Sequence, residues 1–213
     1  ESLNLLAIEN NVTVIIDCGV APGMSNLILG RGNAEFDIHE FKFYVGGLPQ
    51  ERVLPFEYKA PFSPIDVIEE YTRPVRMRID GKDIVVDPLT DTEQIQVDGV
   101  GTLEGFNTDG LRSLLTSFPN IPNMSEKTLR YPGYADKIKL LKQMGFFNRL
   151  HINNTANVLK EAWLMKPGDQ DLTYMKVEIT DTQNKTINYE MIDFHDGEFS
   201  SMSRTTAFTC TAI

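Results

Sequence analysis

Three short segments of the chain combine residue types that could hold a small ligand. They are Gly19-Val-Ala-Pro-Gly23, Gly46-Gly-Leu-Pro49 and Arg130-Tyr-Pro-Gly133. Glycine lets the backbone approach a ligand closely, and proline stiffens the loop around it. Arg130 adds a fork of donors that suits a carboxylate, and Tyr131 adds a hydroxyl on an aromatic ring. The alternative is that each segment is an ordinary turn, and that Arg130 pairs with one of the chain's 30 acidic residues.

The motifs of several well-known catalytic and nucleotide-binding sites are missing. The chain has no GxGxxG or GxxxxGK[ST] loop to bind phosphates, and no GxSxG or HExxH motif. Its three histidines are isolated from one another, and its two cysteines, Cys18 and Cys210, form no CxxC or Cys/His cluster. We therefore expect no metal site, no disulfide scaffold and no tight binding of NAD(P) by this chain alone.

Composition narrows the class of protein further. Hydrophobic residues make up 41% and charged residues 23% of the 213 residues, which is typical of a globular protein. A formal charge of −10 argues against a nucleic-acid partner, because a phosphate-tracking surface is basic. No window approaches the roughly 18 consecutive apolar residues that a membrane span needs, and no secretory signal opens the chain. We expect a cytoplasmic protein that contacts neither nucleic acid nor membrane.

The elements that position these segments are of two kinds. Apolar residues from Leu3 to Ile8, followed by the β-branched run Val12–Ile16, predict a helix and a buried strand from the edge of an α/β unit. From Ile38 onward, strands of alternating pattern and helices follow each other irregularly, without a steady βαβα rhythm. This pattern favours an α+β domain, with about the first twenty residues left over from a neighbouring α/β domain.

The individual elements of the α+β part are predicted from periodicity and from turn residues. The expected strands and hairpins are a strand from Ile38 to Pro49, a hairpin from Val75 to Val86 around Asp80-Gly81, a strand at Thr128–Tyr131 and a hairpin from Leu172 to Phe194. The expected helices begin at Pro64 and at Thr108-Asp-Gly, run from Ile138 to a stop at Gly145, and cover Val158–Leu164 and Met202–Ile213, the last with a helical or mixed pattern.

Four segments, taken in order, resemble the saccharopine dehydrogenase family. Gly19-Val-Ala-Pro-Gly-Met-Ser-Asn26 is similar to the family's loop after the last Rossmann strand, and Tyr44-Val-Gly-Gly-Leu-Pro49 to its Gly-Gly-Leu-Pro run. Lys127-Thr-Leu-Arg-Tyr-Pro-Gly133 is similar to its Thr-Leu-Arg-Tyr-Pro-Gly-His segment, and Ser201-Met-Ser-Arg-Thr-Thr206 to its Met-Ala-Arg-Thr-Thr-Gly close. The resemblance spans nearly the whole chain and is therefore more specific than any single motif.

The resemblance implies a two-domain oxidoreductase. Residues 1–20 would be a remnant of its Rossmann nucleotide-binding domain, and residues 21–213 the substrate-binding and dimerisation domain, with a mixed, largely antiparallel sheet and helices packed on one face. The implied reaction is NAD(P)-dependent and acts on the C–N bond of an amino acid or its imine, of the saccharopine, lysine or carboxynorspermidine class. NAD or NADP would be bound mainly by the Rossmann domain. The partners would be an amino-acid substrate, that Rossmann domain and a second copy of the chain in a homodimer or higher homo-oligomer.

The resemblance also implies roles for individual residues. Arg130 would clamp a substrate carboxylate, with Tyr131 and Asp109 as further catalytic candidates. The candidates for substrate binding are Gly46, Gly47, Thr108 and Arg130, and those for cofactor binding are Gly19, Pro22 and Gly23.

One position departs from the family pattern. Tyr134 stands where the family commonly has the His that follows Arg-Tyr-Pro-Gly. Because a tyrosine hydroxyl has a pKa near 10, it is a poorer proton acceptor at neutral pH than histidine. This departure leaves the general acid or base open and indicates a branch with a different substrate. The alternative function is a non-catalytic module that keeps the fold and binds an amino acid or forms oligomers.

Overall fold

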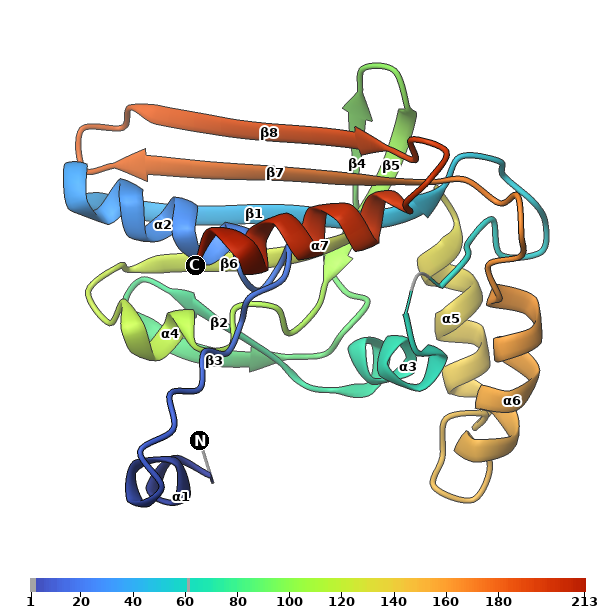
Figure 1. The fold of residues 1–213 in the computed structure, drawn as a ribbon. Helices are drawn as coiled ribbons and strands as arrows, with labels where there is room; N and C mark the ends of the chain where they lie inside the picture. Colours follow the sequence, from blue (N-terminus) through green and yellow to red (C-terminus); the bar gives the residue numbers. More distant parts are fainter. Residues whose placement is uncertain (1–2, 61) are drawn as a thin grey trace.

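The chain folds around one eight-stranded sheet (Figure 1). The computed structural model describes residues 3–60 and 62–213. The strands are β1 (Ile38–Pro49), β2 (Val75–Ile79), β3 (Lys82–Val86), β4 (Glu93–Val97), β5 (Gly101–Asn107), β6 (Asn123–Arg130), β7 (Asp171–Asp181) and β8 (Thr186–Phe194). The helices are α1 (Asn4–Glu9), α2 (Met24–Glu35), α3 (Pro64–Thr72), α4 (Leu114–Ser117), α5 (Tyr134–Gln143), α6 (Ile152–Trp163) and α7 (Ser201–Ala212).

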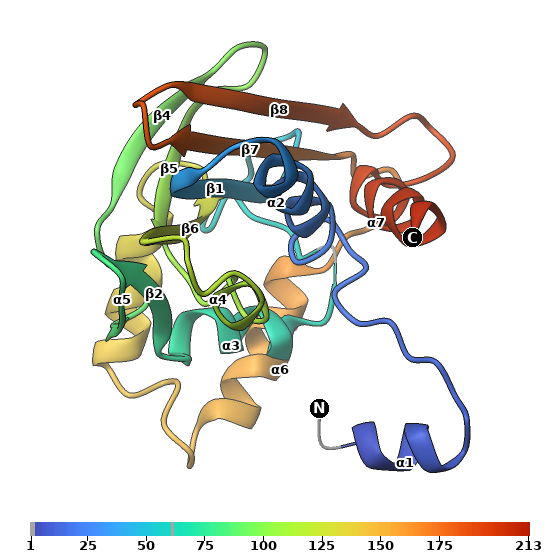
Figure 2. The ribbon, with the colours of Figure 1, turned by 90° about the vertical axis from the view of Figure 1, so that its left-hand side faces the viewer.

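The sheet is mixed but mostly antiparallel. Its main path runs β3-β2-β6-β1-β7-β8, and the β4–β5 hairpin joins it through β5, which pairs with β6. Within the described residues, β1 and β6 form the only parallel pair of strands, with Phe43 beside Glu126 and Val45 beside Thr128. Figure 2 shows the helices gathered on one side of the strands β1, β7 and β8. The predicted α+β class and the largely antiparallel sheet are therefore confirmed.

Elements with strong local signals form where the sequence predicts them. The β2–β3 hairpin turns at Asp80 (φ 49°) and Gly81 (φ 73°), the two positive φ angles that a type I′ turn needs. Helix α3 begins at Pro64, and Gly145, with φ 84°, follows the end of α5 in the left-handed conformation typical of a helix stop. The long hairpin β7–β8 and helices α6 and α7 also match the prediction.

The predicted strand Val12–Ile16 is wrong. These residues belong to no strand, and their side chains are largely exposed, Val14 at 65%. An apolar run becomes a strand only where a neighbouring strand accepts its backbone hydrogen bonds, and no described strand lies beside this one. Helix α1, which precedes this segment in the chain, lies away from the sheet (Figures 1 and 2). The assignment of residues 1–20 to a second domain stays a prediction.

The helix predicted to begin at Thr108 is also wrong at its start. Only the short α4 forms, beginning at Leu114. The Thr108 hydroxyl bonds to the carboxyl of Glu126 on β6 and to Thr128, so it does not cap a helix. The β4–β5 hairpin was not predicted, and β6 begins at Asn123, well before the expected Thr128.

The core consists of three clusters of buried apolar side chains. One lies under α2 and α4, around Phe41, Phe43 and Val177. A second is built by α3, α5 and α6 around Trp163. The third involves Leu129 and Tyr174, with Val97 and Leu103 of the β4–β5 hairpin. Because Phe43 and Glu126 are partners on parallel strands, the face of β6 that carries Glu126 is the one turned toward the first cluster.

Residues 3–60 and 62–213 contain neither a helix suited to a membrane nor a cluster of metal ligands. No helix there combines the length and apolar character that crossing a bilayer requires. No group of three or more His, Cys, Asp or Glu side chains there is placed to hold a metal ion.

Candidate functional site

A row of polar side chains follows one face of strand β6. Side chains two residues apart in a strand point to the same face, so Met124, Glu126, Thr128 and Arg130 share one face. Met124 is buried in the apolar core, as a core-facing position should be. The next three side chains are polar and equally buried, with exposed fractions of 3%, 6% and 3%. The row therefore runs from the core into a polar interior.

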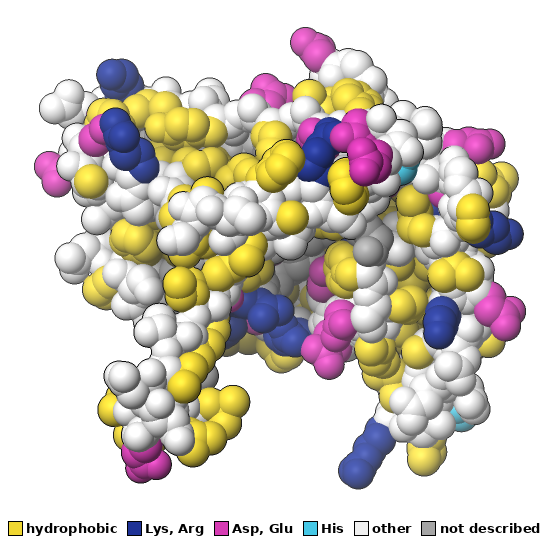
Figure 3. Space-filling view, in the orientation of Figure 1, with side chains coloured by type: hydrophobic (Ala, Val, Ile, Leu, Met, Phe, Trp, Pro, Cys, Tyr) yellow, Lys and Arg dark blue, Asp and Glu magenta, His cyan; other side chains and the backbone are white. Residues whose placement is uncertain are grey.

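These side chains line a cleft made of two adjoining chambers. The larger chamber has a volume of about 220 Å³ and the smaller one about 80 Å³. Both chambers are lined by Ala21, Pro22, Val45, Glu70 and Thr128. The larger chamber also touches Met202 and Thr206 of α7, and Figure 3 shows a hollow below this helix with basic and acidic side chains at its lower edge.

Arg130 is the buried cation of the larger chamber. Its guanidinium lies 4.4 Å from the centre of the Tyr58 ring, and its Nη2 donates to the hydroxyl of Tyr71 at 3.2 Å. Its contact with the Glu70 carboxylate is long, at 3.4 Å. Its Nε has no hydrogen-bond partner among the described residues. Its Nη1 donates to the Leu129 carbonyl at 2.9 Å, so Nε is the one guanidinium nitrogen without a partner among the described residues, and the planar fork suits a carboxylate.

Three tyrosines hold the guanidinium in place. Tyr58, Tyr71 and Tyr134 pack edge to face, with ring centres 5.3 to 5.8 Å apart. Burial raises the pKa of Tyr71 to about 12 and that of Tyr58 well above its usual value, although the positive charge of Arg130 opposes both shifts. Burial also raises the pKa of Tyr134, and the neighbouring Tyr71 and Tyr58 raise it further. All three therefore stay protonated at neutral pH, and none is a proton acceptor.

Glu70 on α3 touches both chambers and is the carboxylate nearest to Arg130. Burial raises its pKa, while Arg130, Arg112 and Arg73 lower it. Because 31% of its side chain is exposed, solvent weakens the effect of burial. Arg112 stands at the smaller chamber with a left-handed φ of 44°, which is uncommon for a residue with a side chain.

The carboxyl of Glu126 lies in the smaller chamber and belongs to no ion pair among the described residues. The Thr108 hydroxyl lies 2.9 and 2.7 Å from its two oxygens and hydrogen-bonds to the carboxyl, and the backbone N–H of Gly110 donates to Oε2 at 3.1 Å. Its pKa is raised to about 8, mainly by burial and also by Glu70 and Asp109, while these hydrogen bonds lower it. A carboxyl with that pKa is mostly protonated at pH 7.

The structure brings most of the residues proposed from the sequence together. Gly19, Pro22, Gly46, Gly47 and Arg130 line the larger chamber, and Thr108 and Asp109 line the smaller one. Asp109 accepts two hydrogen bonds from the guanidinium of Arg76, at 3.0 and 2.8 Å, so its charge is already paired.

Gly23 and Tyr131 are not among the residues that line the cleft. The Tyr131 hydroxyl donates to the carbonyl of Pro49 at 2.8 Å, in the third apolar cluster. At Gly23, an added Cβ would come within 1.9 Å of the Gly19 carbonyl oxygen, so glycine is required there to close the loop on itself.

Sequence reasoning missed several residues of the cleft. They are Tyr58, Glu70, Arg73, Arg112, Glu126 and Thr128, and behind them Tyr71, whose hydroxyl accepts from Arg130. A usable signal existed for two of them, because Glu126, Thr128 and Arg130 alternate in a segment with strand character. The others come from α3, its preceding loop and the loop before α4, whose approach to β6 leaves no trace in local spacing.

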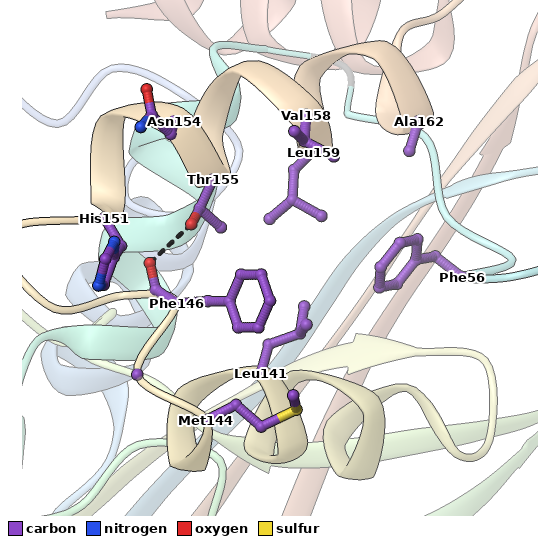
Figure 4. Close-up of a pocket in the computed structure, with 11 residues that line it drawn as sticks. Phe56, Leu141, Met144, Phe146, His151, Asn154, Thr155, Val158, Leu159 and Ala162 are labelled. Atoms are coloured by element: carbon purple, nitrogen blue, oxygen red, sulfur yellow. Dashed lines mark hydrogen bonds between the residues drawn. The ribbon is translucent and has the colours of Figure 1, made fainter.

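The largest of the described cavities lies elsewhere and has a different character. It measures about 440 Å³ and is formed by α5, α6 and the loop between them. Figure 4 shows Phe56, Leu141, Phe146 and Leu159 pointing into it, with Thr155 bonded to the carbonyl of Phe146 at 2.7 Å. No acidic or basic side chain other than His151 lines it, so it offers little for chemistry on a charged amino acid.

Comparison with known proteins identifies the family. Residues 19–213 match the family model described as the saccharopine dehydrogenase C-terminal domain. The chain belongs to this family. Alpha-aminoadipic semialdehyde synthase, mitochondrial, from Bos taurus is 26% identical over 157 residues, which are 66% of this chain and 17% of that protein.

A solved structure shows the same fold. The apo saccharopine dehydrogenase (L-Glu forming) of Saccharomyces cerevisiae superposes with a TM-score of 0.66 at 15% identity, covering 88% of this chain and 60% of that one. The chain thus spans about a sixth of the bovine protein and three fifths of the yeast structure. The predicted membership of the saccharopine dehydrogenase family, a family of oxidoreductases, is confirmed for this domain.

Proposed function

We propose that this domain binds the amino-acid substrate of an NAD(P)-dependent oxidoreductase that acts on a C–N bond. The substrate class is that of saccharopine, lysine or carboxynorspermidine. The observation that carries the proposal is the buried Arg130, whose Nε has no partner among the described residues, on the same strand face as the protonated carboxyl of Glu126. A guanidinium binds a carboxylate, and a carboxyl group pairs with an amine or exchanges a proton with it.

The larger chamber fits the nicotinamide end of a dinucleotide. Val20, Ala21 and Pro22 give it an apolar wall, and a Cβ added at Gly19 would meet Thr206 at 3.8 Å and the Pro22 carbonyl oxygen at 3.3 Å. At about 220 Å³ it is smaller than the roughly 300–1,000 Å³ of typical ligand sites, so a second domain would hold the rest of the dinucleotide. A nicotinamide bound there would supply the hydride acceptor or donor.

The residues of this chain would then bind and orient the substrate. Arg130 would hold the carboxylate, with Tyr58 and Tyr71 keeping the guanidinium in one orientation. The apolar wall at Ala21 and Pro22 would exclude water from the reacting carbon. We further propose that the domain associates with its own Rossmann domain and with a second copy of itself.

The test measures NAD(P)H absorbance with the complete gene product and a panel of L-lysine, saccharopine and carboxynorspermidine. A change with one substrate, reduced in Arg130→Ala, supports the proposal. Silence across the panel, with cofactor binding shown by NAD(P)H fluorescence, refutes it and favours the non-catalytic binding module.

A further inference from the structure

The carboxyl of Glu126 is enclosed by the backbone around it. A Cβ added at Gly110 would lie 2.6 Å from the Glu126 Cδ and 2.8 Å from its Oε2, so a larger residue there would displace the carboxyl from its present position. The Gly110 N–H and the Thr108 hydroxyl both point at the carboxyl oxygens. The loop between β5 and α4 is therefore shaped around the carboxyl.

The charges that face this carboxyl do not neutralise it. None of the ion pairs found in residues 3–60 and 62–213 includes Glu126. From α3 it faces Glu70, and from the loop after β5 it faces Asp109, which is paired with Arg76 of β2. Arg73 and Arg112 line the same chamber and act on Glu70. A buried carboxyl in such surroundings binds either a proton or an incoming cation.

The position of Glu126 relative to Arg130 selects the ligand. The two residues are four positions apart on strand β6, and at about 3.3 Å per residue their Cα atoms lie about 13 Å apart. The side chains shorten that gap, because Arg130 is long and both groups line adjoining chambers. A ligand that reaches both groups needs several bonds between its carboxylate and its nitrogen. A ligand whose nitrogen lies several bonds from its carboxylate therefore suits two groups in adjoining chambers better than an α-amino acid of short side chain does.

We propose that Glu126 is the nitrogen subsite of the cleft, which holds a proton until the ammonium group of an ω-amino carboxylate replaces it, while Arg130 binds the ligand's carboxylate. The O–H bond of the Glu126 carboxyl breaks, the proton leaves to the buffer, and the carboxylate accepts an N–H from the ammonium. The net charge of the chamber is unchanged by this exchange. Thr108 is a positioning residue, since it orients the carboxyl. The inference rests on the proposed function, because it assumes an amino-acid ligand in this cleft.

The experiment follows the exchange on the 213-residue chain. With 13C at the glutamate carboxyls, one resonance that is absent in Glu126→Gln should titrate with a midpoint at about 8. L-lysine or 6-aminohexanoate should lower that midpoint below 7, whereas hexanoate, which lacks the amine, should leave it unchanged or raise it. Calorimetry at pH 7 in buffers of different ionisation enthalpy should show proton release that approaches, but does not exceed, about 0.9 per ligand bound, since a group with pKa about 8 is about 90% protonated there. Glu126→Gln should release none.

Three variants control the interpretation. Glu161→Gln removes an exposed carboxyl on α6 and should leave proton release unchanged. Glu70→Gln removes a neighbouring negative charge and should lower the Glu126 midpoint, whereas Thr108→Val removes a stabilising hydrogen bond and should raise it. These two opposite shifts keep the test decisive even where Glu126→Gln does not fold.

Two failures would be distinguishable. Amide shifts at Thr128 and Arg130 on adding 6-aminohexanoate, with the Glu126 titration unaltered, would overturn the nitrogen subsite alone. No shift at these residues with any ligand of the panel would overturn the proposed amino-acid site, and the subsite with it.

Discussion

Replacing Glu126 by glutamine should change the pH dependence of stability, and the sign follows from burial. The folded-state pKa of Glu126 is raised from 4.5 to about 8. A raised carboxyl contributes stability that is fully present below its unfolded pKa and is lost as the pH rises through the folded value. At about 1.4 kcal/mol per pKa unit, this shift makes the parent lose up to about 5 kcal/mol between pH 4.5 and 8.

The glutamine side chain is nearly the same shape but does not ionise. It can still accept from Gly110, but its new NH₂ group has two hydrogens and mainly the Thr108 hydroxyl as an acceptor, so we expect a cost of about 1–3 kcal/mol for the poorly satisfied N–H. At pH 5 the variant should therefore be less stable than the parent. At pH 9 the parent carries a buried charge that the variant lacks, so the variant should be the more stable one, by about 2–4 kcal/mol after this cost is set against the loss in the parent.

Urea denaturation at pH 5, 7 and 9, followed by far-UV circular dichroism, measures both proteins. Glu161→Gln is the matched control, because its exposed side chain should give the parent's pH dependence. A stability difference between Glu126→Gln and the parent that stays constant from pH 5 to 9 would refute the reasoning, since it would mean that Glu126 is already ionised at pH 5 in the folded protein or is solvated.

Three further predictions concern packing, substrate binding and assembly. Gly46→Ala should lower the free energy of unfolding in urea by about 1–3 kcal/mol, because the new Cβ would lie 2.7 Å from the Leu129 carbonyl oxygen. Gly30→Ala is the matched control: its Cβ would have nothing within 4 Å, and it should raise the free energy of unfolding by about 0.5–1 kcal/mol. Arg130→Ala in the complete gene product should cost about 2–4 kcal/mol of transition-state stabilisation, and an unchanged kcat/KM would remove it from the site. Light scattering at micromolar concentration should show a dimer or larger species, and a monomer would contradict the proposed assembly.

Local signals predicted the elements whose formation depends on a few neighbouring residues. Asp80-Gly81 determines its hairpin because both residues adopt positive φ, and Gly145 ends α5 for the same reason. The run Val12–Ile16 shows the limit of such signals. Its composition suits a buried strand, but strand formation depends on a partner that the run itself does not encode.

The candidate site was predictable only where one residue type pointed to one chemistry. Arg130 could be proposed from its guanidinium and its surrounding segment. The pairing of Thr108 with Glu126 could not, because it depends on the register between β5 and β6 and joins residues 18 positions apart. The sequence also predicted Thr108-Asp-Gly as a helix cap. In that role the Thr108 hydroxyl would have bonded to a nearby backbone N–H instead of to Glu126.

The glycine-rich segments lie at or beside the cleft, but partly for a reason other than the one proposed from the sequence. The sequence argument was that glycines at positions 23 and 46 let a ligand approach the backbone. In the structure, Gly46 makes room for Leu129 of the parallel neighbour β6, and Gly23 makes room for Gly19. These glycines shape the walls of the cleft through packing within the protein. A glycine therefore indicates a close approach, but the sequence alone does not say whether a ligand or the chain itself comes close.

The polar row on β6 is difficult to explain by stability. Met124 shows that this face of the strand belongs to the apolar core, and apolar clusters lie on both sides of the cleft. An apolar side chain at position 126 would continue the apolar pattern and remove the cost of burying a carboxyl that has no ion-pair partner. Instead, the Gly110 backbone and the Thr108 hydroxyl are arranged around this carboxyl. A costly group with its own built surroundings, facing a cavity, is what a binding site requires and a structural core does not.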